Sequence, residues 1–223
     1  MVGFVFSTSL MAQVAPSPLA EGVKMLSYEK NKSALNFFKE AYDKNPADGE
    51  TIFWYGQAIL AQNYNGISTP ESIQKAKELF QKSLQAKGSD AWLLVGMSHI
   101  QSLEGADVNA VKQNLEVAIT STLNTKGKYK GKPSQDIINA IGYVFAELPI
   151  SIGDHKYAID KLKETVSAYD VVNASLYVNL GINYLKLGGG ENGGEAVTAF
   201  QNAINADPKN AYATDKLARL QQK

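Results

Sequence analysis

The stretch YVNLGINYL, residues 177–185, is followed by AVTAF at 196–200 and by Pro208. The first part carries a small residue, Gly181, directly after a leucine and four positions after a tyrosine. The second part places an alanine four positions before a phenylalanine, so both lie on one helix face. Proline then ends the second helix, because it cannot continue one. The stretch therefore predicts two closely packed helices that cross at Gly181.

The same two-part pattern returns along the chain. The small residue of the first helix stands at Gly22, Gly56, Gly96, Gly142, Gly181 and Ala218, so successive copies are, by subtraction, 34, 40, 46, 39 and 37 residues apart. The small residue of the second helix stands at Ala34, Ala76, Val111, Ala158 and Ala196, and the large residue four later is Phe38, Phe80, Leu115, Leu162 and Phe200. These spacings fit a helix-turn-helix repeat of about 34 residues with insertions in its loops.

On these residues the chain resembles the tetratricopeptide repeat (TPR) family. The resemblance implies an all-α, TPR-like solenoid in a right-handed superhelix, with about five repeats and a final helix. It covers residues 14–223, with repeats near 15–48, 49–88, 89–134, 135–173 and 174–210 and a partial one at 211–223. The alternative is an irregular helical bundle. Helices are predicted at 17–29, 32–44, 49–62, 70–86, 90–104, 107–122, 134–148, 154–168, 173–187, 193–206 and 209–222.

Composition narrows the class of function. The 223 residues are 44% hydrophobic, which is enough for a continuous core, and 22 basic residues balance 22 acidic ones. A net charge of zero argues against a general nucleic-acid or anionic-membrane binder, which needs a basic excess. The chain has no cysteine, which excludes disulfides, cysteine-ligated zinc and a cysteine nucleophile. No apolar stretch is long enough to span a bilayer.

Catalytic motifs are also missing from the sequence. The only histidines, His99 and His155, belong to different repeats. His99 falls where the family has a packing residue, and His155 follows the predicted helix cap Asp154. No metalloprotease or hydrolase motif occurs, and the carboxylates are scattered over polar helix faces. We therefore expect no enzyme, no catalytic residue, no metal, no cofactor and no specific small molecule.

The N-terminal residues differ from the repeats. Residues 2–12 are apolar or small, and a short linker with Pro16 and Pro18 follows. This pattern is typical of the apolar core and cleavage region of a secretory signal, although no basic residue precedes Lys24. We interpret residues 1–13 as a signal-peptide remnant. The alternative is a hydrophobic arm that packs on the first repeat.

Two loops and the last helix carry further signals. The loop at 125–133 alternates lysine with glycine and tyrosine. We interpret it as a solvated, flexible connector; the alternative is a contact to phosphate or to an acidic partner. The glycine-rich loop at 188–194 lacks the ending of a phosphate-binding loop. The helix expected at 209–222 repeats the internal pattern instead of showing a polar capping face, which indicates further repeats after Lys223.

The family resemblance also implies a binding surface, because first-helix side chains line the concave face. The family's clamp for a C-terminal carboxylate is absent, since Leu19, Val23, Trp54, Asp90 and Leu94 stand at its positions. An apolar groove followed by an amide-rich one remains, although any of these residues could instead pack against neighbouring repeats. The residues expected to bind a peptide or protein are Phe53, Trp54, Gln57, Leu94, Met97, Asn139, Tyr143 and Asn179.

Two functions follow from this reasoning. The first is a protein–protein interaction scaffold that binds a peptide or protein segment in the groove, with Trp54 as the anchor. The second is a structural subunit of a bacterial envelope complex, whose groove packs on further repeats or on another subunit. The signal-like N-terminus predicts export to the periplasm or cell surface; without it the protein would be cytoplasmic.

Overall fold

The chain folds into an all-helical solenoid. The computed structural model describes residues 17–62, 68–188 and 193–222, and these contain eleven helices and no strand. The signal-like residues 1–13 and most of the glycine-rich loop lie outside the described residues. The helices are α1 (Ala20–Ser27), α2 (Asn31–Lys44), α3 (Gly49–Leu60), α4 (Pro70–Lys87), α5 (Ala91–Leu103), α6 (Val108–Ser121), α7 (Gln135–Glu147), α8 (His155–Ala168), α9 (Ala174–Gly188), α10 (Gly193–Ala206) and α11 (Ala211–Gln221).

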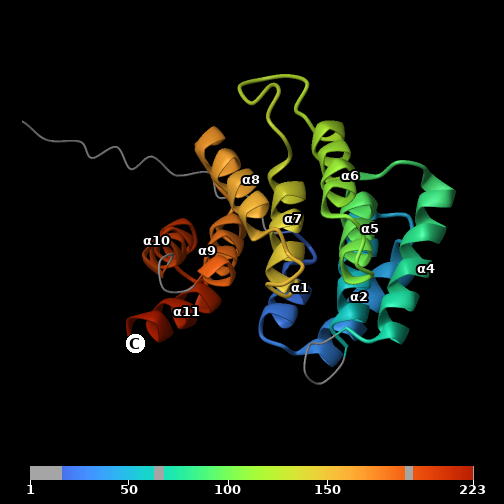
Figure 1. Ribbon diagram of the computed structural model, residues 1–223, viewed down its shortest axis with the longest axis horizontal. Coiled ribbons are helices and arrows are strands. Elements are labelled where there is room, and N and C mark those ends of the chain that lie inside the picture. The colour runs from blue at the N-terminus through green and yellow to red at the C-terminus, as the bar shows by residue number, and fades with distance from the viewer. Residues whose placement is uncertain (1–16, 63–67, 189–192, 223) are drawn as a thin grey trace, which may run out of the picture.

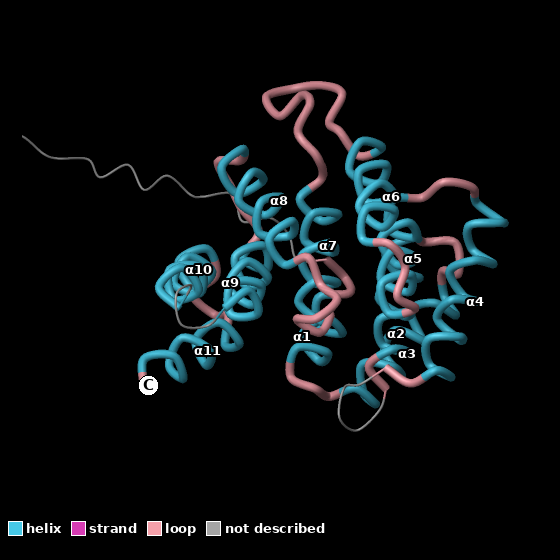
Figure 2. The backbone as a smooth tube through the Cα atoms, viewed as in Figure 1, coloured by secondary structure: helices cyan, strands magenta, loops and turns pink. Residues whose placement is uncertain are grey.

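The helices pack in sequence order, as a repeat solenoid requires. Each helix contacts the next one along the chain, and the first helices α3, α5, α7 and α9 also contact one another in that order. Figure 1 follows the array from the blue α1 through the yellow α7 to the red α11. Figure 2 shows that loops alone join the helices within the described ranges. The predicted fold class is therefore confirmed.

Polar side chains begin several helices where the sequence changes to a helical pattern. The Asp48 carboxylate accepts a hydrogen bond of 2.8 Å from the Thr51 backbone N–H at the start of α3. At the start of α4, Thr69 and Ser72 form a reciprocal capping box, and Pro70 between them is the first residue of the helix. These caps satisfy backbone donors that have no partner within the helix. These caps fix where α3 and α4 start.

The small residues lie at close helix crossings, as predicted. A Cβ atom at Gly56 would lie 2.2 Å from Cζ of Phe80, and one at Gly96 would lie 2.6 Å from the same atom. The fully buried Phe80 ring of α4 is therefore held between the backbones of α3 and α5. In the last repeats, a Cβ at Gly181 would lie 2.8 Å from Cζ of Phe200. Glycine allows these helices to approach closely.

The core runs along the array and encloses two helices. Ten of the twelve residues of α3 are buried, and nine of the thirteen residues of α7 are buried. A helix that is apolar on every side belongs in the interior. No helix within the described ranges is both long and apolar enough to cross a bilayer. The buried helices α3 and α7 therefore form the centre of the core behind the concave side of the array.

Candidate functional site

A hollow in the described part of the protein lies on the inner side of the array. It has a volume of about 400 Å³, within the usual range for ligand sites. Its walls come from α1, α3, α5, α7, α9, α11 and the residues next to them, and α2, α4, α6, α8 and α10 contribute none. We call this hollow the inner cavity. It follows the first helices of successive repeats.

Aromatic rings form the floor of the inner cavity. The Trp54 indole of α3 meets the Tyr143 ring of α7 edge to face, with centroids 5.0 Å apart. Phe53 packs beneath, with its ring centroid 4.9 Å from that of Trp54 and 5.4 Å from that of Trp92. Because Trp54 is only 3% exposed and Tyr143 9% exposed, a ligand would bury little additional surface of either ring. They shape the floor, and the half-buried Trp92 offers more free surface.

Two tyrosines close one side of the inner cavity. The ring of Tyr28, just after α1, meets the ring of Tyr212 in α11 edge to face at 5.8 Å. The first and last described helices therefore touch across the concave face. Burial, with nearby carboxylates, raises the pKa of Tyr212 to about 12. The same causes raise the pKa of Tyr143 well above its usual value, so both hydroxyls stay protonated near neutral pH.

Two asparagines provide the polar side of the wall. Asn179 Nδ2 donates to Asn139 Oδ1 at 2.8 Å and to the Asn139 carbonyl at 3.2 Å. This bond uses the donor of one amide and the acceptor of the other. Asn139 Nδ2 and Asn179 Oδ1 have no hydrogen-bond partner among the described residues. The pair therefore leaves one donor and one acceptor, which together match the two polar groups of a peptide bond.

Three carboxylates, Glu50, Asp136 and Asp207, line the inner cavity. Glu50 and Asp136 lie in the first turns of α3 and α7, and Ser17 Oγ donates to Glu50 Oε1 at 3.0 Å. Burial, then repulsion from Asp136, raises the pKa of Glu50, and burial raises the pKa of Asp136. Lys24 and Lys209 also line the cavity. Within the described ranges neither Glu50 nor Asp136 forms an ion pair, so the cavity disfavours a further negative charge.

The structure brings together half of the residues expected from the sequence. Trp54, Asn139, Tyr143 and Asn179 line the inner cavity. Phe53 lies beneath its floor, and Leu94 and Met97 are half-buried and pack against the core. Gln57 is 2% exposed, and its Oε1 lies 2.8 Å from Nδ1 of His99. That bond joins two buried side chains across the α3–α5 contact, and none of these four residues lines the inner cavity.

Several lining residues were not expected from the sequence. Tyr28 lies just outside α1, and Trp92 lies in α5 two residues before the predicted Leu94. Applying the family's inner-face positions to the first and last helices as well would have directed attention to α1 and α11. The contact between those helices carries no signal in the sequence, because it depends on the curvature of the whole array.

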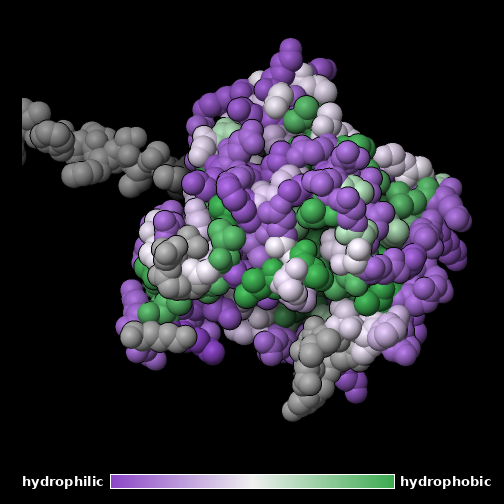
Figure 3. Space-filling model, in the orientation of Figure 1, coloured by the Kyte–Doolittle hydropathy of each residue, from purple (hydrophilic) through white to green (hydrophobic). Residues whose placement is uncertain are grey.

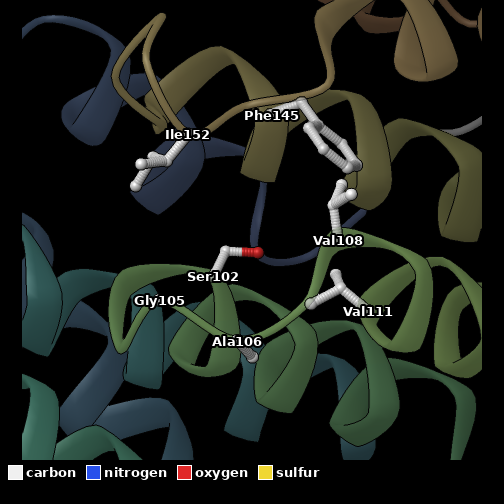
Figure 4. Close-up of a pocket in the computed structure, with 7 residues that line it drawn as sticks. All are labelled: Ser102, Gly105, Ala106, Val108, Val111, Phe145 and Ile152. Atoms are coloured by element: carbon white, nitrogen blue, oxygen red, sulfur yellow. The ribbon is translucent and has the colours of Figure 1, made fainter.

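A second, smaller hollow lies between the α5–α6 turn and the α7–α8 loop (Figure 4). It measures about 170 Å³ and is lined mainly by apolar side chains, with Val108, Phe145 and Ile152 around Ser102. The Ser102 hydroxyl already donates to the Ser98 carbonyl at 2.9 Å. The Ser102 hydroxyl therefore has no free hydrogen to donate to a ligand. The inner cavity is the better candidate.

Comparison with known proteins identifies the fold. No family model matches the chain, and no curated protein matches it. A solved structure, the thermophilic TPR protein TTC0263 of Thermus thermophilus, is similar with a TM-score of 0.53 at 19% identity, over 92% of this chain and 98% of that chain. This similarity shows a TPR-like fold.

Two further solved structures are less similar. YrrB, described as a TPR protein with an unusual peptide-binding site, has a TM-score of 0.43 at 17% identity and 87% coverage of each chain. The APC/C hetero-tetramer Cut9-Hcn1 has a TM-score of 0.46 at 18% identity, over 91% of this chain and 42% of that chain.

Proposed function

We propose that the protein is a protein–protein interaction scaffold that holds an extended peptide segment in the inner cavity. The observation that carries this proposal is the Asn139–Asn179 pair on the cavity wall, whose mutual bond leaves the Asn139 amide donor and the Asn179 amide acceptor available. A peptide bond offers one partner for each of them. A ligand main chain would satisfy both amides together.

Side-chain recognition would come from the aromatic surfaces around that pair. Trp92 and the half-exposed Tyr28 offer ring surface, and Val178 adds an apolar patch from α9. Aromatic rings lose little conformational freedom on binding and contribute strongly to interfaces. In this arrangement the buried Trp54 ring forms the floor of the cavity, and it is not the anchor for the ligand that the sequence led us to expect. Glu50 and Asp136 favour a neutral or basic peptide over an acidic one.

Random-peptide phage display on the purified protein tests this proposal. The selected peptides are then measured by calorimetry against wild type and Asn139→Leu, which keeps the side-chain size and removes both polar groups. We expect about a tenfold loss of affinity, because one or two hydrogen bonds of about 1 kcal/mol each are lost. Asn114→Leu is the matched control, since Asn114 is also half-buried but lies on α6, outside the cavity.

Equal affinity of the two variants for every selected peptide would contradict the proposal. Peptides that lose affinity only for Asn114→Leu would place the binding surface on the second helices. Circular dichroism melting of both variants shows whether either substitution also affects the fold.

We also propose that the protein is exported. The apolar residues 2–12 and the proline-containing linker after them support this. Residues 2–12 lie outside the described residues. A fusion of residues 1–18 to alkaline phosphatase, which is active only after export, tests it. An inactive fusion in a bacterial host would favour the hydrophobic-arm interpretation.

A further inference from the structure

The loop between α6 and α7 is a second surface, separate from the inner cavity. We call residues 124–133 the lysine loop. Its four lysines are Lys126, Lys128, Lys130 and Lys132. Figure 1 shows it projecting beyond the helices at the top of the view, and Figure 3 shows a mostly hydrophilic surface there. It has more order than the solvated connector expected from the sequence.

Backbone hydrogen bonds give the lysine loop a defined shape. The Asn124 N–H donates to the Lys132 carbonyl at 2.9 Å, and the Gly131 N–H donates to the Asn124 carbonyl at 2.8 Å. Gly127 and Gly131 have φ angles of 75° and 76°, which glycine adopts without strain. The two ends of the loop are therefore held together, and the lysines are carried on a folded tip.

Side chains attach the lysine loop to the next repeat. The Tyr129 ring packs on the Tyr169 ring with centroids 4.4 Å apart. The Tyr169 hydroxyl donates to the Pro133 carbonyl at 2.6 Å. Lys128 forms an ion pair with Asp170, which also accepts a hydrogen bond from the Tyr129 hydroxyl at 3.2 Å. These contacts hold the tip in place beside the α8–α9 connection.

Three positive charges on this tip are left over. Within the described ranges, no ion pair involves Lys126, Lys130 or Lys132, and all three are exposed. The rest of the chain has 22 − 4 = 18 basic residues against 22 acidic ones, a net charge of −4. The lysine loop is therefore a positive pole on a negatively charged body, and the protein will orient in an electric field.

The composition of this pole favours one kind of partner. Two large apolar side chains, Leu123 and Val171, are exposed beside the residues that anchor the loop. Arginine, which nucleic-acid sites use for phosphate and base contacts, occurs once in the chain, at Arg219, where it pairs with Asp215. The Tyr129 ring is already stacked and is not free to stack on a base. Exposed lysines on a projecting tip, with exposed apolar side chains beside the base of the loop, suit the interface of an anionic bilayer.

We propose that the lysine loop docks the protein on a membrane surface rich in anionic phospholipid headgroups. The lysine ammonium groups meet the negative surface potential, and the exposed Leu123 and Val171 flank the base of the loop. Each lysine near such a surface strengthens binding by about fivefold, which corresponds to about 1 kcal/mol. Three free lysines then give about a hundredfold preference for anionic over neutral vesicles.

Vesicle co-sedimentation of the full chain tests the proposal. The vesicles contain phosphatidylcholine alone or phosphatidylcholine with about one third phosphatidylglycerol. The variant carries Lys126→Gln, Lys130→Gln and Lys132→Gln, and it should lose about a hundredfold in partitioning to anionic vesicles. Binding of the wild type should also fall steeply with added salt, because these charges are exposed and screened.

A matched control separates the loop from overall charge. Lys32→Gln, Lys82→Gln and Lys163→Gln remove the same charge from exposed lysines on α2, α4 and α8, and this variant should keep binding to within about threefold. Equal losses for the two variants would overturn the proposal, as would equal wild-type binding to both kinds of vesicle. Loop-dependent binding to polyglutamate or duplex DNA without binding to vesicles would assign the surface to an acidic protein or a nucleic acid instead. Melting curves confirm that both variants fold.

Discussion

Replacing Gly56 with alanine should destabilise the protein, because the added methyl group enters the space of the Phe80 ring. The new Cβ would lie 2.2, 2.7 and 3.0 Å from Cζ, Cε1 and Cε2 of that ring. The ring has no room to retreat, because the α5 backbone at Gly96 lies against its other side. Either the ring takes a strained rotamer or α3 and α4 move apart.

The expected magnitude follows from two opposing terms. Overpacking of a well-packed core costs about 1–3 kcal/mol, and this site lies at the upper end because the ring is confined on both sides. Alanine offsets up to about 1 kcal/mol through its better helix propensity. We therefore expect a net loss of about 2 kcal/mol, which lowers the melting temperature by about 4–8 °C in a chain of this length.

Thermal melting followed by circular dichroism measures this effect against Gly194→Ala. Gly194 also lies in a helix, and a Cβ there would meet no atom within 4 Å. That variant should melt within about 2 °C of wild type or slightly above it. Phe80→Leu should rescue part of the Gly56→Ala loss in a double-mutant cycle, because it shortens the confined ring. Equal melting temperatures for the two alanine variants, or strict additivity in the cycle, would refute the reasoning.

Three further predictions concern single side chains. Burial lowers the pKa of His99 from 6.5 to about 4, so the unfolded chain binds a proton before the folded one as the pH falls. The free energy of unfolding should therefore drop by up to about 3 kcal/mol between pH 6.5 and 4. Urea titrations should show a smaller drop for His99→Gln. Asp48→Ala removes the cap of α3 and should cost about 1 kcal/mol in the same assay, whereas Asp48→Asn should cost less than half as much. Trp54→Ala should cost about 3–5 kcal/mol in unfolding free energy, because a buried ring is lost; a cost below about 1 kcal/mol would show that the floor of the inner cavity does not depend on this ring.

The repeat architecture was predictable because its signals are local. A glycine at each crossing and an alanine four positions before a large apolar residue specify which faces of two neighbouring helices meet. Gly56 and Phe80 are close in sequence, so their contact follows from one repeat alone. Helix starts were predictable within one to three residues, because residues such as Asp48 and Thr69 cap them.

The inner cavity was only partly predictable, because it depends on how strongly the array curves. Curvature brings Tyr143 of α7 onto Trp54 of α3, two repeats away, and so covers a ring that was expected to be open. The Gln57–His99 bond likewise depends on the rotation of α3 against α5. The order of the lysine loop comes from Tyr169 and Asp170, far away in sequence, which composition cannot reveal.

The edge-to-face contact between Tyr28 and Tyr212 has a consequence for how the protein opens. In a linear array the terminal helices fray independently, since each repeat contacts only its neighbours. Here the contact joins α11 to the residue that follows α1, so the release of α11 should also free the Tyr28 ring and widen the inner cavity. Native-state hydrogen exchange should therefore show amides of both helices exchanging with one common opening free energy. Any molecule that occupies the cavity against both tyrosines would slow exchange at the two ends of the chain together.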